Sequence, residues 1–132
     1  MDITKKERDC IVKIRELSGS FPPRLSDIAS ELKIKPPTAI ELLERLERKG
    51  LIKKEHGMII LTDTGNDEYL KIMLAHRTYE ILLSMSGVPA DDACSQAERI
   101  DYLMEPSSMM HVLERLGSPE KCPHGKPIIP KE

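Results

Sequence analysis

The chain has 132 residues, of which 39% are hydrophobic and 32% are charged, and this composition is typical of a folded globular protein. No apolar stretch approaches the roughly 20 residues of a membrane-spanning helix, and the first residues lack the apolar core of a secretory signal. We therefore expect a cytoplasmic protein without a membrane partner, whose three cysteines are free thiols.

Charge is divided unevenly along the chain. Residues 1–63 carry 13 Lys and Arg against 11 Asp and Glu, whereas residues 64–132 carry 7 against 11. A basic local surface is enough for phosphate binding, so the net charge of −2 does not exclude a nucleic-acid partner. The division predicts two domains, over residues 1–63 and 64–132.

Helical spacing and helix-ending residues predict three helices in the first domain. Apolar residues of the first helix end at a Ser-Gly-Ser-Phe-Pro-Pro run over residues 18–23, and a second helix covers about residues 25–32. The third helix starts at Pro36, because N–H groups in the first turn of a helix make no intrahelical hydrogen bond and proline is tolerated there. It ends at Lys49-Gly50.

A short β-hairpin is predicted next. Residues 51–55 and 58–61 are β-prone runs joined by His56-Gly57. Helix, helix-turn-helix and hairpin, in that order, make up a winged helix-turn-helix domain.

The second domain is predicted to be helical. A long helix runs from Thr62 to about Ser86, another from Pro89 to about Met104, and a third from Pro106 to Gly117, followed by an irregular tail. The later turns of the long helix are apolar nearly all round, which predicts a symmetric dimer that covers them. The expected fold class is mostly α with a small β-hairpin wing, an N-terminal winged helix-turn-helix and a C-terminal helical dimerisation domain.

The third helix has the features of a DNA-recognition helix. Its polar residues fall on the face opposite its leucines, and lysines follow in the hairpin. The same face would suit a winged-helix protein-interaction module, but the helix-turn-helix order favours double-stranded DNA. The predicted DNA-binding residues are Lys35, Pro37, Thr38, Glu41, Arg45, Lys53 and Lys54.

Candidate metal ligands lie in the second domain. His76 and Glu80 are spaced i, i+4 on the long helix, and Cys94, Glu98, Asp101 and Glu105 form a single stripe on the next helix. Such carboxylates suit Mn²⁺ or Fe²⁺, and a thiol shifts the preference towards Fe²⁺, Co²⁺ or Zn²⁺. From spacing alone, an ordinary solvated acidic face is the stronger interpretation, with His76 as a core histidine.

Other chemistry is poorly supported. The tail holds two soft ligands in Cys122-Pro123-His124-Gly125, but no second pair stands at a zinc-site spacing. The sequence has no glycine-rich phosphate loop, nucleophile elbow or His-Glu-x-x-His helix. We therefore expect neither an enzyme nor a small-molecule substrate.

Four motifs follow one another along the chain: Pro36-Pro37-Thr38, Leu61-Thr62-Asp63-Thr64-Gly65, Ala75-His76-Arg77 with Glu80, and Cys122-Pro123-His124-Gly125-Lys126-Pro127-Ile128. In this order they resemble the iron-dependent repressor family, the group of the diphtheria toxin repressor and the manganese transport regulator. The resemblance covers about residues 9–130 and implies a short, two-domain, metal-dependent homodimeric repressor of a palindromic operator that controls metal homeostasis. Fe²⁺ or Mn²⁺ is the expected metal, with Co²⁺ or Zn²⁺ as alternatives.

The resemblance also implies metal-ligand positions, which in this chain are Asp9, His76, Glu80, Cys94, Glu98 and Asp101. Two positions depart from the family pattern, because Tyr102 replaces a histidine ligand and Val12 replaces a carboxylate. A metal-blind regulator, or one that responds through Cys10, Cys94 or Cys122, therefore stays open as an alternative.

Overall fold

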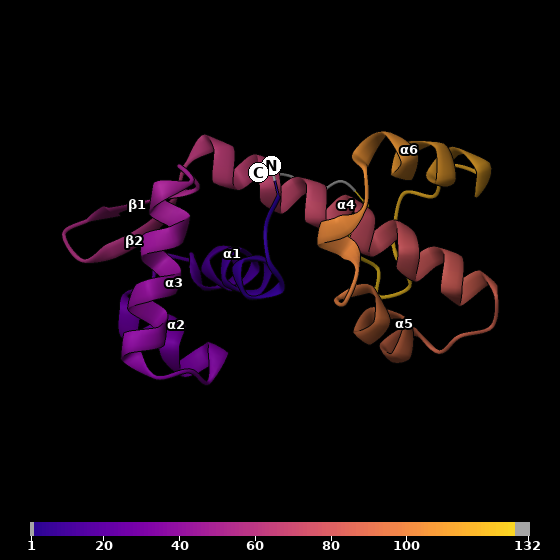
Figure 1. The fold of residues 1–132 in the computed structure, drawn as a ribbon. Helices are drawn as coiled ribbons and strands as arrows, with labels where there is room; N and C mark the ends of the chain where they lie inside the picture. The colour runs from indigo at the N-terminus through magenta and orange to yellow at the C-terminus, as the bar shows by residue number, and fades with distance from the viewer. Residues whose placement is uncertain (1, 129–132) are drawn as a thin grey trace. The chain divides into compact units, whose positions relative to one another are not determined.

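The computed structural model describes residues 2–128. Within that part, no helix is both long enough and apolar enough to cross a membrane. The chain folds into two compact units, Met1–Tyr69 and Leu70–Glu132 (Figure 1). We call them the first unit and the second unit.

The first unit begins with three helices, α1 (Lys5–Leu17), α2 (Leu25–Leu32) and α3 (Pro36–Arg48). Thr4 caps α1 through a capping box, in which its side chain accepts from the Glu7 N–H and the Glu7 side chain accepts from the Thr4 N–H. Proline occupies the first turn of α3. The three predicted helices are present, because local capping and helix-breaking residues agree with the apolar spacing.

The wing is an antiparallel pair of strands, β1 (Ile52–Glu55) and β2 (Met58–Leu61). His56 and Gly57 both have positive φ angles, 51° and 80°, as a two-residue type I′ hairpin turn requires. The expected fold class, mostly helical with a two-stranded wing, is confirmed.

Aliphatic side chains from all of these elements form the core of the first unit. α1 packs against α2, α3 and β2, and α3 also contacts α2 and β1, as Figure 1 shows. The fully buried side chains include Ile11, Ile14, Ile28, Leu43, Leu46, Leu51 and Ile59. This packing fixes α3 by its leucine side and leaves the opposite side in solvent.

The helix α4 (Asp63–Met85) starts in the first unit and continues into the second. Thr62 accepts a hydrogen bond from the Gly65 N–H at 3.1 Å, which caps the helix start. Gly65 is required there, because a Cβ at this position would lie 2.0 Å from the Leu51 carbonyl oxygen. The helix start predicted at the Thr62 motif is therefore present.

In the second unit, α5 (Ala90–Ala97), the 3₁₀ turn η1 (Asp101–Leu103) and α6 (Pro106–Arg115) follow α4. The expectation of one helix from Pro89 to about Met104 is wrong. The backbone tightens after Ala97, where the Ile100 N–H bonds to the Ala97 carbonyl instead of continuing the α pattern. Residues spaced i, i+3 share a face in both helix types, so periodicity did not separate them.

The core of the second unit joins α4, α6 and the tail through Ile81, Leu113, Cys122 and Ile128, with Leu74 and Leu116 packed around them. The tail was expected to be irregular, yet residues 120–128 form a closed turn. The Cys122 N–H bonds to the Lys126 carbonyl at 2.8 Å, and the Ile128 N–H bonds to the Glu120 carbonyl at 3.0 Å. This turn fixes Cys122 and His124 beside α4.

Candidate metal centre and DNA-binding face

The exposed side of α3 carries most of the predicted DNA-binding residues. Lys35, Pro37, Thr38 and Glu41 are exposed, and Arg45 is half-buried. Lys35 is the N-cap residue and has no side-chain capping bond. The helix therefore presents polar side chains in its first turns, the part that reads base edges in a recognition helix.

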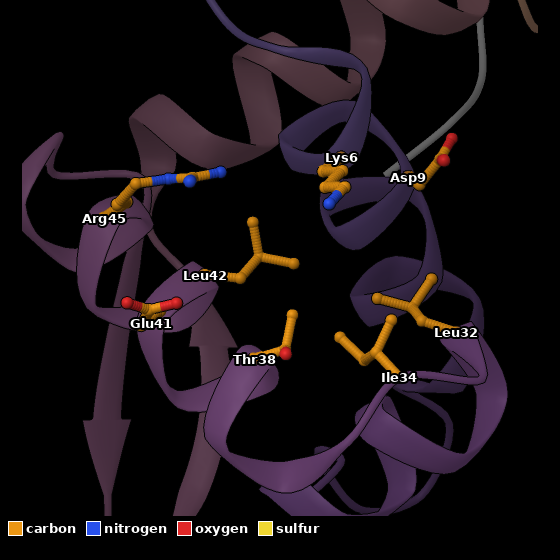
Figure 2. Close-up of a pocket in the computed structure, with 8 residues that line it drawn as sticks. All are labelled: Lys6, Asp9, Leu32, Ile34, Thr38, Glu41, Leu42 and Arg45. Atoms are coloured by element: carbon orange, nitrogen blue, oxygen red, sulfur yellow. The ribbon is translucent and has the colours of Figure 1, made fainter.

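A hollow of about 290 Å³ lies between α1, the α2–α3 turn and α3 (Figure 2). Leu32, Ile34 and Leu42 give it apolar walls. The Lys6 and Arg45 side chains approach it from α1 and α3 (Figure 2). Asp9 and Glu41 add two carboxylates to the same lining, so the hollow offers an anion such as a backbone phosphate two cations but no net positive charge.

The wing supplies two further cations. Lys53 and Lys54 in β1 are both exposed. Lys53 lies 3.2 Å from Glu55, and both side chains are more than half exposed, so the pair contributes little to stability. Both lysines therefore suit salt-sensitive contacts with a phosphate backbone.

In the second unit, nitrogen, oxygen and sulfur donors converge on one point. His76, Glu80 and Cys94, which we call the His76 group, place one ligand atom each within 4.8 Å of one another. The His76 Nε2 atom lies 2.9 Å from a Glu80 oxygen and 3.4 Å from the Cys94 sulfur. Ligands of a tetrahedral zinc ion with bonds of ~2.0–2.3 Å are separated by about 3.3–3.8 Å, so modest adjustment admits a metal.

Asp101 orients the His76 ring. Its carboxylate lies 2.9 Å from the His76 Nδ1 atom, and the Asp101 side chain is fully buried. With the Nδ1 hydrogen donated to Asp101, the Nε2 lone pair of neutral His76 points at a carboxylate and a sulfur. That cluster of lone pairs is favourable only with a proton or a metal cation among them, as in carboxylate–histidine–metal sites.

A second donor set shares Glu80. Glu80, Cys122 and His124, the Cys122 group, also place ligand atoms within 4.8 Å of one another. His124 Nδ1 lies 3.0 Å from the second Glu80 oxygen, and its Nε2 lies 3.0 Å from Asp91. The two oxygens of Glu80 therefore face different donor sets.

The electrostatics of both sets agree with sites that attract positive charge. Burial alone would lower the pKa of His76, but hydrogen bonds to Asp101 and Glu80 raise it above its usual value. Burial alone would raise the pKa of Glu80, yet its hydrogen bonds with His76 and His124 lower it. Hydrogen bonds to Asp91 and Glu80 raise the pKa of His124.

Three predicted ligands lie outside these sets. One is Asp101, which contacts the His76 Nδ1 atom instead of joining the His76 group, so its own ligand role stays a prediction. Glu98 is the C-cap residue of α5 and is exposed, although its N–H still bonds to the Cys94 carbonyl at 3.1 Å. Asp9 belongs to the first unit, where it pairs with Lys5 at 2.6 Å and Arg8 at 3.1 Å. Ligand roles for Asp9 and Glu98 stay predictions.

Sequence reasoning left three nearby residues out of the site. Cys122 and His124 were recognised as soft ligands but set aside, and Asp91, which lies 3.0 Å from His124 Nε2, was not among the candidates. The signal was the i, i+2 spacing of the thiol and imidazole, which needed a third ligand. Glu80 supplies a third donor beside them, and its position beside the tail depends on tertiary packing.

The sequence matches two family models in succession. The model described as the iron-dependent repressor N-terminal DNA-binding domain matches residues 9–57. The model described as the iron-dependent repressor metal-binding and dimerisation domain matches residues 62–130. Together they confirm the family resemblance and agree with the expectation that the chain is a regulator rather than an enzyme.

Individual relatives agree with the family models. The iron-dependent repressor IdeR of Mycobacterium leprae is 29% identical over 115 residues, covering 86% of this chain and 50% of the repressor. The transcriptional regulator MntR of Listeria welshimeri is 27% identical over 96 residues, covering 72% of this chain and 65% of the regulator. This chain thus spans half to two thirds of their lengths.

The fold agrees as well. The crystal structure of a hypothetical protein from Sulfolobus solfataricus aligns with a TM-score of 0.84 and 32% identity, covering 98% of this chain and all of that one. With matching DNA-binding and metal-binding domain models in the right order, the chain belongs to the iron-dependent repressor family.

Proposed function

We propose that this chain is a metal-dependent transcriptional repressor, in which metal bound to the second unit controls DNA binding by the first. The observation that carries the proposal is the His76 group, three buried or half-buried donors that converge beside the orienting carboxylate of Asp101. An ordinary solvated acidic face would not bring such donors together in a buried position. It supports a divalent cation as the regulatory ligand.

The proposed metal is a divalent first-row ion. The donors of the His76 group are an imidazole nitrogen, a carboxylate oxygen and a thiol sulfur. The family and the IdeR and MntR relatives favour Fe²⁺ or Mn²⁺, while the sulfur favours Fe²⁺, Co²⁺ or Zn²⁺ over Mn²⁺. Fe²⁺ satisfies both arguments, and it makes control of metal homeostasis the natural biological role.

The proposed DNA-binding form is a homodimer on a palindromic operator in the cytoplasm. Leu82 and Met85 on α4 are 37% and 66% exposed, and Met110 on α6 is 47% exposed. Ile81, Met109 and Leu113 are buried within the second unit and so are not available at its surface. A two-fold dimer through the exposed residues would present two recognition helices to symmetric half-sites.

Cobalt spectroscopy tests the metal site directly. Metal-free protein titrated with Co²⁺ under reducing, oxygen-free conditions should develop sulfur-to-cobalt charge-transfer absorption, which Cys94→Ser and His76→Ala should weaken. Cys122→Ser separates the contribution of the Cys122 group, and Cys10→Ser is the control, since burial raises the pKa of that thiol to about 12. Spectra that no variant alters would contradict the proposed site.

A further inference from the structure

The first turns of α3 carry an unusual pair of exposed residues. Ile40 is an aliphatic residue with 42% of its surface exposed, and the adjacent Glu41 is an exposed carboxylate. The leucines that hold the helix in the core, Leu42 and Leu43, lie on the other side. Neither Ile40 nor Glu41 is therefore needed to pack α3 against the rest of the unit.

Glu41 has no partner of its own within residues 2–128: no hydrogen bond or ion pair involves its carboxylate. Figure 2 shows it on α3 between Thr38 and Arg45. A carboxylate brought into a DNA groove loses water and is repelled by phosphates, so it weakens binding unless a base donates a hydrogen bond. Its presence on this face restricts which bases can be bound.

The major-groove edges of the four bases decide which base satisfies a carboxylate. Guanine offers acceptors at N7 and O6, and thymine offers an acceptor at O4, so both repel it. Adenine has a donor at N6 beside an acceptor at N7. Cytosine has the N4 amino donor and no neighbouring acceptor, so it is the base that a carboxylate selects.

Ile40 selects a different group. It cannot form a hydrogen bond, and the base-edge group that gains from apolar contact in the major groove is the C5 methyl of thymine. Successive helix residues point about 100° apart, so Ile40 and Glu41 reach different base pairs.

We propose that Glu41 and Ile40 set the operator sequence of this chain. Each half-site contains a cytosine whose N4 amino group donates to the Glu41 carboxylate. A nearby thymine has its methyl group against Ile40. This inference rests on the proposed function, because it assigns α3 to the major groove.

Selection from random double-stranded DNA tests the role of Glu41. The metal-loaded full chain should enrich a site with one invariant cytosine in each half. Glu41→Gln should replace that cytosine with adenine, because an amide pairs bidentately with adenine N6 and N7, and the preference at that position should change by about tenfold. Glu47→Gln is the matched control: it removes the same charge from an exposed position in the last turn of α3 and should keep the cytosine.

Deoxyuridine substitution tests the role of Ile40, because it removes only the thymine methyl group. Replacing each operator thymine in turn should weaken wild-type binding about fourfold at one position per half-site, the effect of burying one methyl group. Ile40→Ala should bind the thymine and deoxyuridine probes equally.

The outcomes separate the two proposals. If the wild type enriches no site with Fe²⁺, Mn²⁺, Co²⁺ or Zn²⁺, the proposed function fails and takes the base assignment with it. If a site is enriched but its bases are the same for wild type and Glu41→Gln, the repressor function stands and the assignment to Glu41 is overturned. All of the substitutions are at exposed positions, and circular dichroism checks that each variant remains folded.

Discussion

The two units each bury a glutamate, and the partners of these glutamates differ. Glu7, 1% exposed, accepts hydrogen bonds from the Lys49 ammonium and the Thr4 N–H, both at 2.9 Å. Glu80, 2% exposed, lies against the imidazoles of His76 and His124, at 2.9 and 3.0 Å. The first unit thus supplies a permanent positive charge to its buried carboxylate, whereas the second supplies only titratable bases.

This difference separates structural from regulatory charge. A buried carboxylate with its own lysine is neutralised at every physiological pH, so it needs no external ligand, and removing either partner would leave an uncompensated buried charge. A buried carboxylate among imidazoles and thiols is neutralised by protons or by a metal ion, so its state depends on the solution. We therefore propose that Glu80 and its neighbours respond to metal, whereas Glu7 and Lys49 form a structural ion pair.

The largest effect is expected at Glu80, because both donor groups share it. Glu80→Gln should lower the affinity for Fe²⁺ or Co²⁺ by about tenfold to a hundredfold, since it replaces a charged ligand with a neutral amide. The specific DNA affinity gained on adding metal should fall with it. Equilibrium dialysis and fluorescence anisotropy measure the two quantities.

Glu105→Gln is the control for this variant, because it removes an exposed carboxylate of the same unit and should leave both affinities unchanged. Glu98→Ala sharpens the ligand assignment: an effect as large as that of Glu80→Gln would place Glu98 among the ligands. Equal metal binding by wild type and Glu80→Gln would contradict the proposal that Glu80, unlike Glu7, takes part in metal binding.

Dimerisation through the second unit is the next largest effect. Leu82→Asp places a charge on an exposed part of α4 and should give monomers in analytical ultracentrifugation, with operator affinity lost because two half-sites are no longer bound together. Phe21→Asp changes a 79% exposed residue of the first unit and should stay dimeric. A wild-type protein that sediments as a monomer at micromolar concentration would contradict the dimer.

A smaller effect is expected from the wing lysines. Replacing both Lys53 and Lys54 with Gln should weaken binding to all DNA sequences alike and reduce the slope of log affinity against log salt by about 2, one for each lost phosphate contact. Anisotropy titrations at several salt concentrations measure the slope. An unchanged slope would remove the wing from the DNA-binding surface.

The smallest effect is a pH-dependent change in stability at Glu7. Burial alone would raise the pKa of Glu7, but its hydrogen bonds with Lys49 and Thr4 lower it below the ordinary value of 4.5. A lowered folded-state pKa gives stability that is present above pH 4.5 and is lost as the pH falls through the folded value. Glu7→Gln should therefore reduce the free energy of unfolding by about 1 kcal/mol at pH 7.

The same substitution should cost progressively less as the pH falls below 4, and urea denaturation across this range measures the change. The metal-free protein is the right sample, because bound metal would add its own stabilisation. A destabilisation that does not vary with pH would show that the Glu7 charge has no role.

Sequence alone predicted most of the first unit and less of the second. The winged helix followed from local signals, such as Pro36 at a helix start and His56-Gly57 in a hairpin turn, which act over a few residues. The His76–Glu80 pair also followed from spacing within one helix. Local signals did not predict the end of α5 at Ala97 or the closed turn of the tail.

The end of α5 at Ala97 and the closed turn of the tail determine which candidate donor side chains lie together. Asp101 reaches His76 because the chain tightens into a 3₁₀ turn, and His124 reaches Glu80 because the tail folds back beside α4. Both contacts join residues far apart in sequence, and their geometry depends on tertiary packing. Helical spacing therefore identified His76, Glu80 and Cys94, which the fold brings together, while a ligand role for Glu98 stays a prediction.

Operator binding by the same protein sample with and without metal directly tests whether metal controls DNA binding. A labelled operator obtained by selection is titrated with metal-free protein, and then with protein saturated with Fe²⁺ under oxygen-free conditions. We expect metal to raise the specific operator affinity at least tenfold, because a ligand that binds the DNA-competent state preferentially shifts the protein towards that state. Nonspecific DNA binding should change little. Equal operator affinities for the metal-free and metal-loaded protein would contradict metal control of DNA binding.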